Sequence, residues 1–263
     1  MNAPHPPAGS IEIRPIPAFQ DNYIWMLARD GCAAVVDPGD AAPVHAALRA
    51  DGLKLTDILV THHHGDHVGG VAELADAYRA RVWGPARESI PRRQVALAEG
   101  DAVEALGQRF EVIEVPGHTL GHIALYAPAL AILLCGDTLF ACGCGRLFEG
   151  TPAQMFESLG KLARLPGATR AYCAHEYTLS NIRFARAVEP DNAELAARSR
   201  DCEQLRARNE PTVPSTLALE RATNPFLRCD QPAVRAAAER RSPGAGADPV
   251  STFAAIRAWK NEF

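Results

Sequence analysis

The sequence predicts an α/β protein that carries a smaller α-helical part at its C-terminus. Over the first two-thirds of the chain, short apolar runs alternate with amphipathic segments, which is typical of buried strands connected by helices. After about residue 177 the chain is rich in Ala, Arg and Glu at helical spacing. The 263 residues, 47% hydrophobic and 22% charged, can bury a large core, as in an ordinary globular enzyme. We expect a flexible tail at 1–10, a catalytic α/β domain at 11–177 and a helical substrate-binding domain at 178–263.

The elements of the α/β part are predicted one by one from short stretches. "YIWML" and "CAAVVDPGD" are apolar runs separated by the turn-forming "ARDG", which predicts two strands joined by a tight turn. Later runs such as "RFEVIEV" and "AILLCG" have the same strand character. In chain order we expect strands at 23–27 and 32–40, a helix at 41–50, a strand at 57–60, a helix at 68–79, strands at 109–115, 122–127 and 131–136, a helix at 152–164 and a strand at 169–174.

Charge and hydropathy exclude several classes of partner. The net charge of -4 gives no general attraction to nucleic acid or to anionic membranes. No apolar run approaches the roughly 18 residues that a membrane-spanning helix needs. The N-terminal "MNAPHPPAGS" lacks the basic and apolar regions of a signal peptide. We therefore expect a cytoplasmic monomer that binds neither nucleic acid nor membranes.

The seven cysteines do not form a disulfide framework, because they are odd in number and scattered along the chain. Cys142 and Cys144 form a C-x-C pair that could bind a soft metal. No second thiol pair at ligand spacing accompanies them, so structural thiols are favoured over metal ligands.

Histidine and aspartate follow four separate predicted strands. "DILV" leads into "THHHGDH", "VIEVPG" into "HTLGH", "AILLCG" into "DTLF" and "AYCA" into "HEY". The carboxyl ends of strands are where sites assemble in α/β sheets. A histidine triplet alone is often a solvated loop, but the three further groups at strand ends favour a metal site.

The spacing of these groups favours two metal ions. In an extended backbone His62 and His64 project to the same side, while His63 points away. Asp66 and His67 follow Gly65, where the chain turns toward a second position. We expect one ion at His62, His64 and His118, another at Asp66, His67 and His175, and a bridging Asp137. His63 and His122 are expected to support these ligands.

The ligand chemistry indicates a hydrolytic centre. Imidazole and carboxylate without thiolate suit zinc, iron or manganese, and we expect two divalent ions, with zinc favoured. Two such ions with two aspartates and a bridging hydroxide leave about one positive charge, which favours an anionic substrate or a developing oxyanion. Paired ions can acidify a water and polarise an electrophile.

Several motifs resemble known proteins. "THHHGDHVGG", "PGHTLGH", "CGDTLF" and "AHEYT" resemble the metallo-β-lactamase superfamily, whose fold is a four-layer αβ/βα sandwich. "FQDNYIW", "ACGCGRLFEGTPAQM", "HEYTLSNIRFARAVEPDN", "TNPFLR" and "AIRAWKNEF" resemble one family within it, glyoxalase II (hydroxyacylglutathione hydrolase). This likeness runs from residue 11 to 263 and includes the helical C-terminal domain.

The resemblance implies an activity and its residues. The family hydrolyses S-lactoylglutathione to lactate and glutathione, as in methylglyoxal detoxification, with a metal-bridging hydroxide as nucleophile and Asp66 and Asp137 as the catalytic carboxylates. Its metal ligands fall on the same seven residues. Its glutathione-binding residues fall on Arg146, Tyr177, Arg257 and Lys260. Arg146 stands where some relatives have Lys, and Phe148 where some have Tyr.

Three other functions are alternatives to this hypothesis. Persulfide dioxygenases resemble the N-terminal part and also use glutathione derivatives, with a single iron, but generally lack the helical extension. A β-lactamase is disfavoured by the absence of a signal peptide and by the cationic pair at Arg257 and Lys260. A non-catalytic metal-bound scaffold is disfavoured by the intact ligand set.

Overall fold

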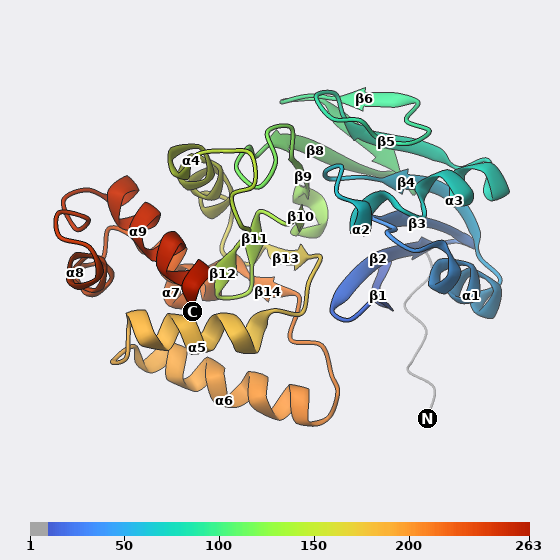
Figure 1. Cartoon of the computed structure of the whole chain (residues 1–263). Coiled ribbons are helices and arrows are strands. Elements are labelled where there is room, and N and C mark those ends of the chain that lie inside the picture. The colour runs from blue at the N-terminus through green and yellow to red at the C-terminus, as the bar shows by residue number, and fades with distance from the viewer. Residues whose placement is uncertain (1–9) are drawn as a thin grey trace. The chain divides into compact units, whose positions relative to one another are not determined.

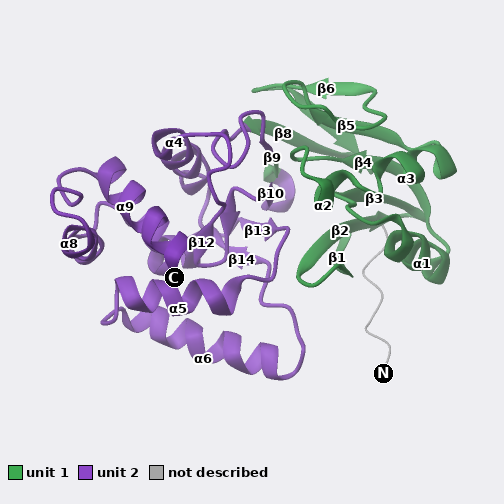
Figure 2. Cartoon of the chain, in the orientation of Figure 1, with its two compact units in different colours: residues 1–113, 125–128 green, residues 114–124, 129–263 purple. Residues whose placement is uncertain are grey.

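The structure is a computed structural model that describes residues 10–263, so the predicted tail lies outside the described residues except for Ser10 (Figure 1). The chain divides into two compact units (Figure 2). Unit 1 comprises the chain up to residue 113 together with residues 125–128, and unit 2 comprises 114–124 and 129–263. The domain boundary expected at 177/178 stays a prediction.

Unit 1 is built on a six-stranded mixed sheet in which the strands follow one another in chain order. The first three strands are antiparallel neighbours, and the last three continue the sheet in parallel. The strands are β1 (Glu12–Ala18), β2 (Asn22–Arg29), β3 (Cys32–Val36), β4 (Lys54–Leu59), β5 (Arg81–Pro85) and β6 (Val95–Leu97). This order leaves β1 at one edge of the sheet, where its two prolines remove no interior ladder bond.

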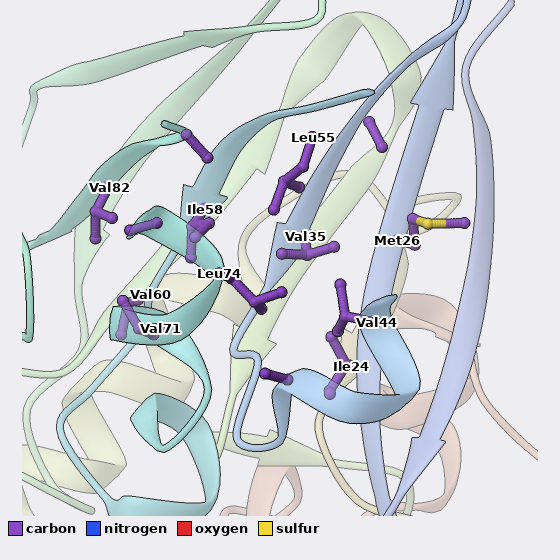
Figure 3. Close-up of a cluster of buried hydrophobic side chains, with 14 of the residues drawn as sticks. Ile24, Met26, Val35, Val44, Leu55, Ile58, Val60, Val71, Leu74 and Val82 are labelled. Atoms are coloured by element: carbon purple, nitrogen blue, oxygen red, sulfur yellow. The ribbon is translucent and has the colours of Figure 1, made fainter. Parts of the chain in front are cut away.

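Two helices of unit 1, α1 (Ala41–Asp51) and α3 (Val71–Tyr78), supply apolar side chains to the core of this sheet. Figure 3 shows Val44 of α1 and Leu74 of α3 beside Val35 and Ile58 of the strands. The helix α1 begins where Asp40 accepts a hydrogen bond from the Ala42 N–H. Burial of this continuous apolar layer fixes the strand ends from which the site residues project.

The remaining strands of unit 1 form a hairpin of β7 (Ala102–Ala105) and β8 (Gln108–Glu114). The strand β9 (Ile123–Ala127) and the 3₁₀ turn η1 (Pro128–Leu130) span the division between the units. All five residues of β9 are buried, which agrees with the continuous apolar run in the sequence.

Three strands of unit 2 form one end of the second six-stranded sheet, whose order is β14-β13-β10-β9-β8-β7. The strand β10 (Ile132–Gly136) pairs in parallel with β13 (Arg170–Cys173), which pairs antiparallel with β14 (Ser215–Thr216). Between β10 and β13, β11 (Leu139–Phe140) and β12 (Gly143–Cys144) form a two-stranded hairpin, followed by α4 (Pro152–Ala163). Thr151 and Gln154 form a capping box that begins α4.

The C-terminal part of unit 2 is helical, as predicted. Its helices surround an aromatic cluster in which Phe226 packs against Phe184 and Phe253. The elements are α5 (Thr178–Val188), α6 (Ala193–Ala207), α7 (Leu217–Thr223), the 3₁₀ turn η2 (Pro225–Leu227), α8 (Pro232–Arg241) and α9 (Pro249–Glu262). Among the described residues, no helix is long and apolar enough to cross a bilayer.

Each element expected in the α/β part is present, with ends that differ by a few residues. The helix expected at 68–79 is shorter, α3, and a separate short helix, α2 (Gly65–Val68), precedes it. Gly69 and Gly70 lie between the two, where a Cβ would clash with the backbone of Gly39 and Asp40. The sequence prediction missed β1, β5, β6 and β7, together with the two-residue strands. These strands are short, interrupted by proline, or flanked by polar residues, and therefore give little periodic signal.

Candidate functional site

The predicted ligands of unit 1 lie together just after β4. His62 lies in the loop after the strand, His64 has an extended backbone conformation, and Asp66 and His67 lie on α2. His62 Nε2 lies 3.1 Å from His64 Nδ1. His67 Nε2 lies 3.5 Å from Asp66 Oδ2. Unit 1 thus presents two pairs of ligand atoms in the grouping that the sequence predicts.

Buried hydrogen bonds fix the tautomer of His62. The Thr61 hydroxyl donates to Asp37 Oδ2 at 2.7 Å, so its oxygen is left to accept from His62 Nδ1, 3.1 Å away. His62 therefore carries its proton on Nδ1 when neutral. Its Nε2 then offers a lone pair, which is the form that a metal ligand requires.

The sequence analysis missed Asp37, which supports two of these residues. The side chain is buried, accepts from the Thr61 N–H at 2.7 Å, and lies 3.3 Å from His67 Nδ1. One ligand atom each of Asp37, His62 and His67 lie within 4.8 Å of one another. Its bonds to Thr61 and His67 favour a supporting role. Asp37 follows β3, so the strand-end criterion that located the histidines could have found it.

Two further contacts complete this half of the site. The Asn22 side chain, at the start of β2, donates from Nδ2 to Asp66 Oδ2 at 3.0 Å. His63 turns to the buried Glu88, with 3.0 Å between Nδ1 and Oε2. His63 is thus paired with a carboxylate outside the predicted ligand set, and its supporting role stays a prediction.

The predicted ligands of unit 2 converge on one carboxylate oxygen. Asp137 Oδ2 lies 3.5 Å from His118 Nε2 and 3.4 Å from His175 Nε2. All three side chains are at most 9% exposed. An oxygen that faces one histidine from each predicted metal position is suited to bridge two ions.

The orientation of these ligands is also set by hydrogen bonds. His118 Nδ1 donates to the Arg146 carbonyl at 2.8 Å, because a carbonyl can only accept, so the neutral ring presents the lone pair of Nε2. The Asp137 N–H donates to His122 Nε2 at 3.1 Å. His122 is fully buried and holds the backbone of Asp137, which agrees with its predicted supporting role.

The spacing of the ligand atoms fits bound metal. Two ligand atoms held about 2.0–2.1 Å from one tetrahedral ion lie about 3.3 Å apart. The four ligand-pair distances within the units are 3.1, 3.5, 3.5 and 3.4 Å. The donor set of imidazole and carboxylate therefore fits divalent cations in both chemistry and spacing.

Two glycines allow the backbone to approach these ligands. A Cβ on Gly39 would lie 1.8 Å from the Asp66 carbonyl oxygen. A Cβ on Gly145 would lie 2.0 Å from the Asp137 carbonyl oxygen. Any larger residue at either position would displace an aspartate of the predicted ligand set.

The C-x-C thiols are structural. Cys142 donates toward Thr223, and burial raises the pKa of its thiol to about 12. Cys144 is likewise buried, which raises the pKa of its thiol. Both side chains therefore stay protonated at neutral pH and do not present the thiolate that a metal binds.

Arg257 is a buried cation on α9. It is 4% exposed, and its Nη1 donates to the Cys144 carbonyl at 2.9 Å. Its Nη2 donates to Asn261 Oδ1 at 3.1 Å, and the guanidinium lies over the Phe226 ring. Its position is thus set by a carbonyl and an aromatic face, with no carboxylate among these contacts.

Lys260 lies one helical turn after Arg257, near three arginines. Its Nζ donates to Ser180 O and Oγ at 3.3 Å. Burial, followed by repulsion from Arg257, Arg183 and Arg146, lowers the pKa of Lys260 to about 8. Within residues 10–263 none of these four cations forms an ion pair with a carboxylate. We call Arg146, Arg183, Arg257 and Lys260 the cation cluster; Arg183 was not predicted from the sequence.

The other predicted substrate residues adjoin the predicted metal ligands of unit 2. The Tyr177 ring stacks on His175, with centroids 4.6 Å apart. The Arg146 side chain is exposed, and its carbonyl holds His118. Phe148 is 64% exposed, and its ring meets His118 edge-on at 5.3 Å. Arg146 therefore joins the two parts of unit 2, because its carbonyl contacts the predicted ligand His118 and its side chain belongs to the cation cluster.

Comparisons with known proteins cover nearly the whole chain. Residues 18–175 match the family model described as metallo-beta-lactamase superfamily. Residues 176–263 match the model described as hydroxyacylglutathione hydrolase C-terminus. Among solved structures, the BLEG-1 B3 metallo-beta-lactamase is 22% identical with a TM-score of 0.61, over 83% of this chain and 99% of that one. The di-iron-bound form of TTHA1623 is 28% identical with a TM-score of 0.58, over 82% and 100%. The predicted metallo-β-lactamase fold is confirmed.

Full-length relatives are more similar still. A protein of Pseudomonas aeruginosa (strain LESB58) named hydroxyacylglutathione hydrolase is 58% identical over 257 residues, which is 96% of this chain and all of the relative. A protein of the same name from Alkalilimnicola ehrlichii is 60% identical over 255 residues, with 95% and 99% covered. The chain therefore belongs to the hydroxyacylglutathione hydrolase family of the metallo-β-lactamase superfamily.

Proposed function

We propose that this chain hydrolyses S-(2-hydroxyacyl)glutathione thioesters, with S-lactoylglutathione as the reference substrate, to glutathione and a 2-hydroxy acid such as lactate. Such a reaction would serve methylglyoxal detoxification. The observation that carries the proposal is the identity of 58% to a protein named hydroxyacylglutathione hydrolase over 96% of this chain. The cation cluster supports it, because glutathione carries carboxylates remote from its sulfur.

We further propose that the seven predicted ligands hold two divalent ions. His62, His64 and His118 would bind one ion, and Asp66, His67 and His175 the other, with Asp137 shared. Zinc is favoured, with iron and manganese as alternatives that the same donors accept. When bound, the ions supply an acidified water and a positive field for the carbonyl oxygen of the thioester.

The protein's own groups would set the direction of attack. Asp66, held by Asn22 at one oxygen, can accept a hydrogen bond from the attacking water and aim it at the thioester carbon. Asp137, whose Oδ2 lies close to the rings of His118 and His175, would hold the two imidazoles in position. The water gives one proton to solvent and its oxygen adds to the carbonyl carbon. The C–S bond then breaks, the hydroxy acid forms, and the sulfur leaves as thiolate. Because a thiol has a pKa of about 8.5, no strong general acid is required.

The cation cluster and Tyr177 would bind the peptide. Arg257 and Lys260 lie on one face of α9 and can hold a carboxylate, with Arg146 adding charge at the loop beside His118. Phe148 offers an apolar ring where some relatives of the resembled family have a hydroxyl. The bound tripeptide would thereby place its sulfur at a fixed distance from the metal ligands of unit 2.

The alternative is a persulfide dioxygenase that acts on glutathione persulfide. The match of residues 176–263 to the hydroxyacylglutathione hydrolase C-terminus supports the hydrolase, because dioxygenases of this superfamily are expected to lack that part.

We propose a catalytic domain at 11–177 and a substrate-binding domain at 178–263. These functional domains differ from the two compact units, which divide the chain elsewhere. The family models meet at 175/176, which supports that boundary.

We also propose a cytoplasmic monomer. All seven cysteines are free thiols, six of them buried, which suits a reducing compartment.

A substrate panel tests the function. Purified protein loaded with zinc, iron or manganese is assayed on S-lactoylglutathione, on other acyl-glutathiones and on an acyl thioester of a simple thiol. Metal content is measured on the same samples. We expect rapid hydrolysis of the glutathione thioesters with about two ions per chain. Oxygen consumption on glutathione persulfide without thioester hydrolysis would establish the alternative instead.

Lys260 should give the Michaelis constant a pH dependence. Its pKa of about 8 means that the free protein carries the ammonium below pH 8 and loses it above. Substrate binding is favoured by the charged form, so we expect KM to rise about 10-fold from about pH 7 to about pH 9.5. In Lys260→Arg the charge persists throughout this range, and KM should change little. Steady-state KM measured for both proteins across pH checks this, and parallel curves would contradict it.

A further inference from the structure

The β11–β12 hairpin contacts predicted site residues on two sides. The Phe140 ring meets His175 at 5.8 Å and Tyr177 at 5.3 Å between ring centroids. At the other end, the Cys144 carbonyl accepts from Arg257 at 2.9 Å. The hairpin therefore links a predicted metal ligand with the cation cluster, and a shift of its backbone would move both.

A single buried amide holds both strands of this hairpin. Asn224, which is fully buried, donates from Nδ2 to the Phe140 carbonyl at 3.2 Å and to the Gly143 carbonyl at 2.9 Å. Its Oδ1 accepts from the Phe226 N–H at 3.1 Å. The side chain thus ties one carbonyl of β11 and one of β12 to the start of η2.

Glu220 holds the turn of the same hairpin. Its Oε2 accepts from the Cys142 N–H at 2.9 Å and from Asn224 Nδ2 at 3.0 Å. Cys142 has a φ of 56°, a left-handed conformation that non-glycine residues adopt rarely. A bond from a buried carboxylate to this N–H stabilises a turn shape that the sequence does not favour locally.

The Glu220 carboxylate is also held at its other oxygen, Oε1. Arg198 Nη2 lies 2.5 Å from Glu220 Oε1, and the Ser215 hydroxyl donates to the same oxygen at 2.5 Å. Arg198 Nη1 donates to Thr223 at 2.6 Å. Glu220 is fully buried and Arg198 is 5% exposed. A buried ion pair is weak evidence for stability, because desolvation offsets the attraction, whereas it does fix geometry.

We propose that Asn224 and Glu220, held by Arg198, are positioning residues that set the hairpin and thereby the place of Arg257 in the cation cluster. This inference rests on the proposed function, since glutathione is the ligand whose carboxylate Arg257 would bind. We call the three residues the hairpin clamp. They touch no reacting atom and act through the Cys144 carbonyl.

The test compares Asn224→Ala with a matched control, Asn192→Ala. Asn192 also donates from Nδ2 to a carbonyl, that of Ala222, at 3.0 Å, and caps a helix through Leu195. It makes no bond to the hairpin among its described contacts. In the metal-loaded full chain we expect Asn224→Ala to weaken glutathione binding about 10-fold, measured by calorimetry, and to raise KM for S-lactoylglutathione more than it lowers kcat. Asn192→Ala should leave both unchanged.

A double-mutant cycle shows whether the clamp acts through Arg257. In an Arg257→Ala background, Asn224→Ala should cause no further loss of glutathione affinity. Losses that multiply in the double variant would overturn the inference. So would equal losses in Asn224→Ala and Asn192→Ala, since that result indicates general destabilisation.

A second variant and a second measurement test the proposal if Asn224→Ala does not fold. Asn224→Ser keeps a shorter donor and the ion pair, and amide hydrogen exchange of the peptide spanning 139–146 is followed by mass spectrometry. Faster exchange there than in wild type, with unchanged exchange in α6, supports the clamp, and unchanged exchange at 139–146 overturns it. If the wild-type protein neither binds glutathione nor hydrolyses its thioesters, the proposed function is overturned. If the wild type is active and Asn224→Ala binds glutathione as tightly as the wild type, only the hairpin clamp is overturned.

Discussion

Asp137→Ala is expected to lose bound metal and to hydrolyse S-lactoylglutathione roughly 1,000-fold more slowly than the wild type. The Asp137 Oδ2 atom lies within 3.5 Å of ring nitrogens of both His118 and His175, so one substitution removes the atom that the two histidines face. Without it, two buried imidazoles remain beside each other, and the charge that offsets bound cations is reduced. Elemental analysis and kcat on the same sample measure the effect.

The control for this variant is Asp230→Ala, which removes an exposed carboxylate from the same unit. It should keep full metal content and activity. A metal-free yet fully active Asp137→Ala would refute a metal-dependent mechanism. A variant that keeps two ions per chain but loses turnover would instead show that Asp137 acts on the substrate.

Replacement of Arg257 and Lys260 by Ala is expected to raise KM for S-lactoylglutathione about 100-fold while kcat falls little. A hydrogen bond to a charged group contributes about 1.5–3 kcal/mol, so each cation corresponds to a factor of about 10 or more. Arg257 and Lys260 lie on α9, and neither is among the predicted metal ligands, so their loss should weaken binding of the peptide more than it alters the reacting bond.

Arg240→Ala serves as the matched control, because this exposed arginine lies on α8 and is not among the charges that act on Lys260. The hydrolysis of a simple acyl thioester, which has no peptide carboxylate, should be the same in all three proteins. An unchanged KM in the double variant would remove Arg257 and Lys260 from the binding site.

The candidate ligands could be selected from the sequence because they occupy one kind of place in the fold. His62, His118, Asp137 and His175 each come a few residues after a strand, and that pattern can be seen without a structure. Asp37 also follows a strand, but it was not predicted as a site residue, because that strand was expected to continue to residue 40. The family resemblance, in turn, identified Arg257 and Lys260, whose spacing alone is equally typical of a solvated helix face.

Other features could not be predicted because they depend on tertiary contacts. Arg183 belongs to the cation cluster only because α5 packs so that Ser180 accepts from Lys260. Arg198 and Glu220 are 22 positions apart, and nothing local indicates that both are buried and paired. The two-residue strands β11 and β12 are too short for any periodicity, although their shape determines where Cys144 meets Arg257.

No carboxylate among the described residues pairs with the cation cluster, so binding of an anion there would also affect the stability of the C-terminal helices. Arg183 lies on α5, while Arg257 and Lys260 lie on α9, and an anion bound at the cluster would relieve their mutual repulsion. A ligand that binds only the folded chain raises its stability in proportion to the logarithm of its concentration. Glutathione, as the released product, would therefore act as a structural counterion that holds these two helices together between turnovers.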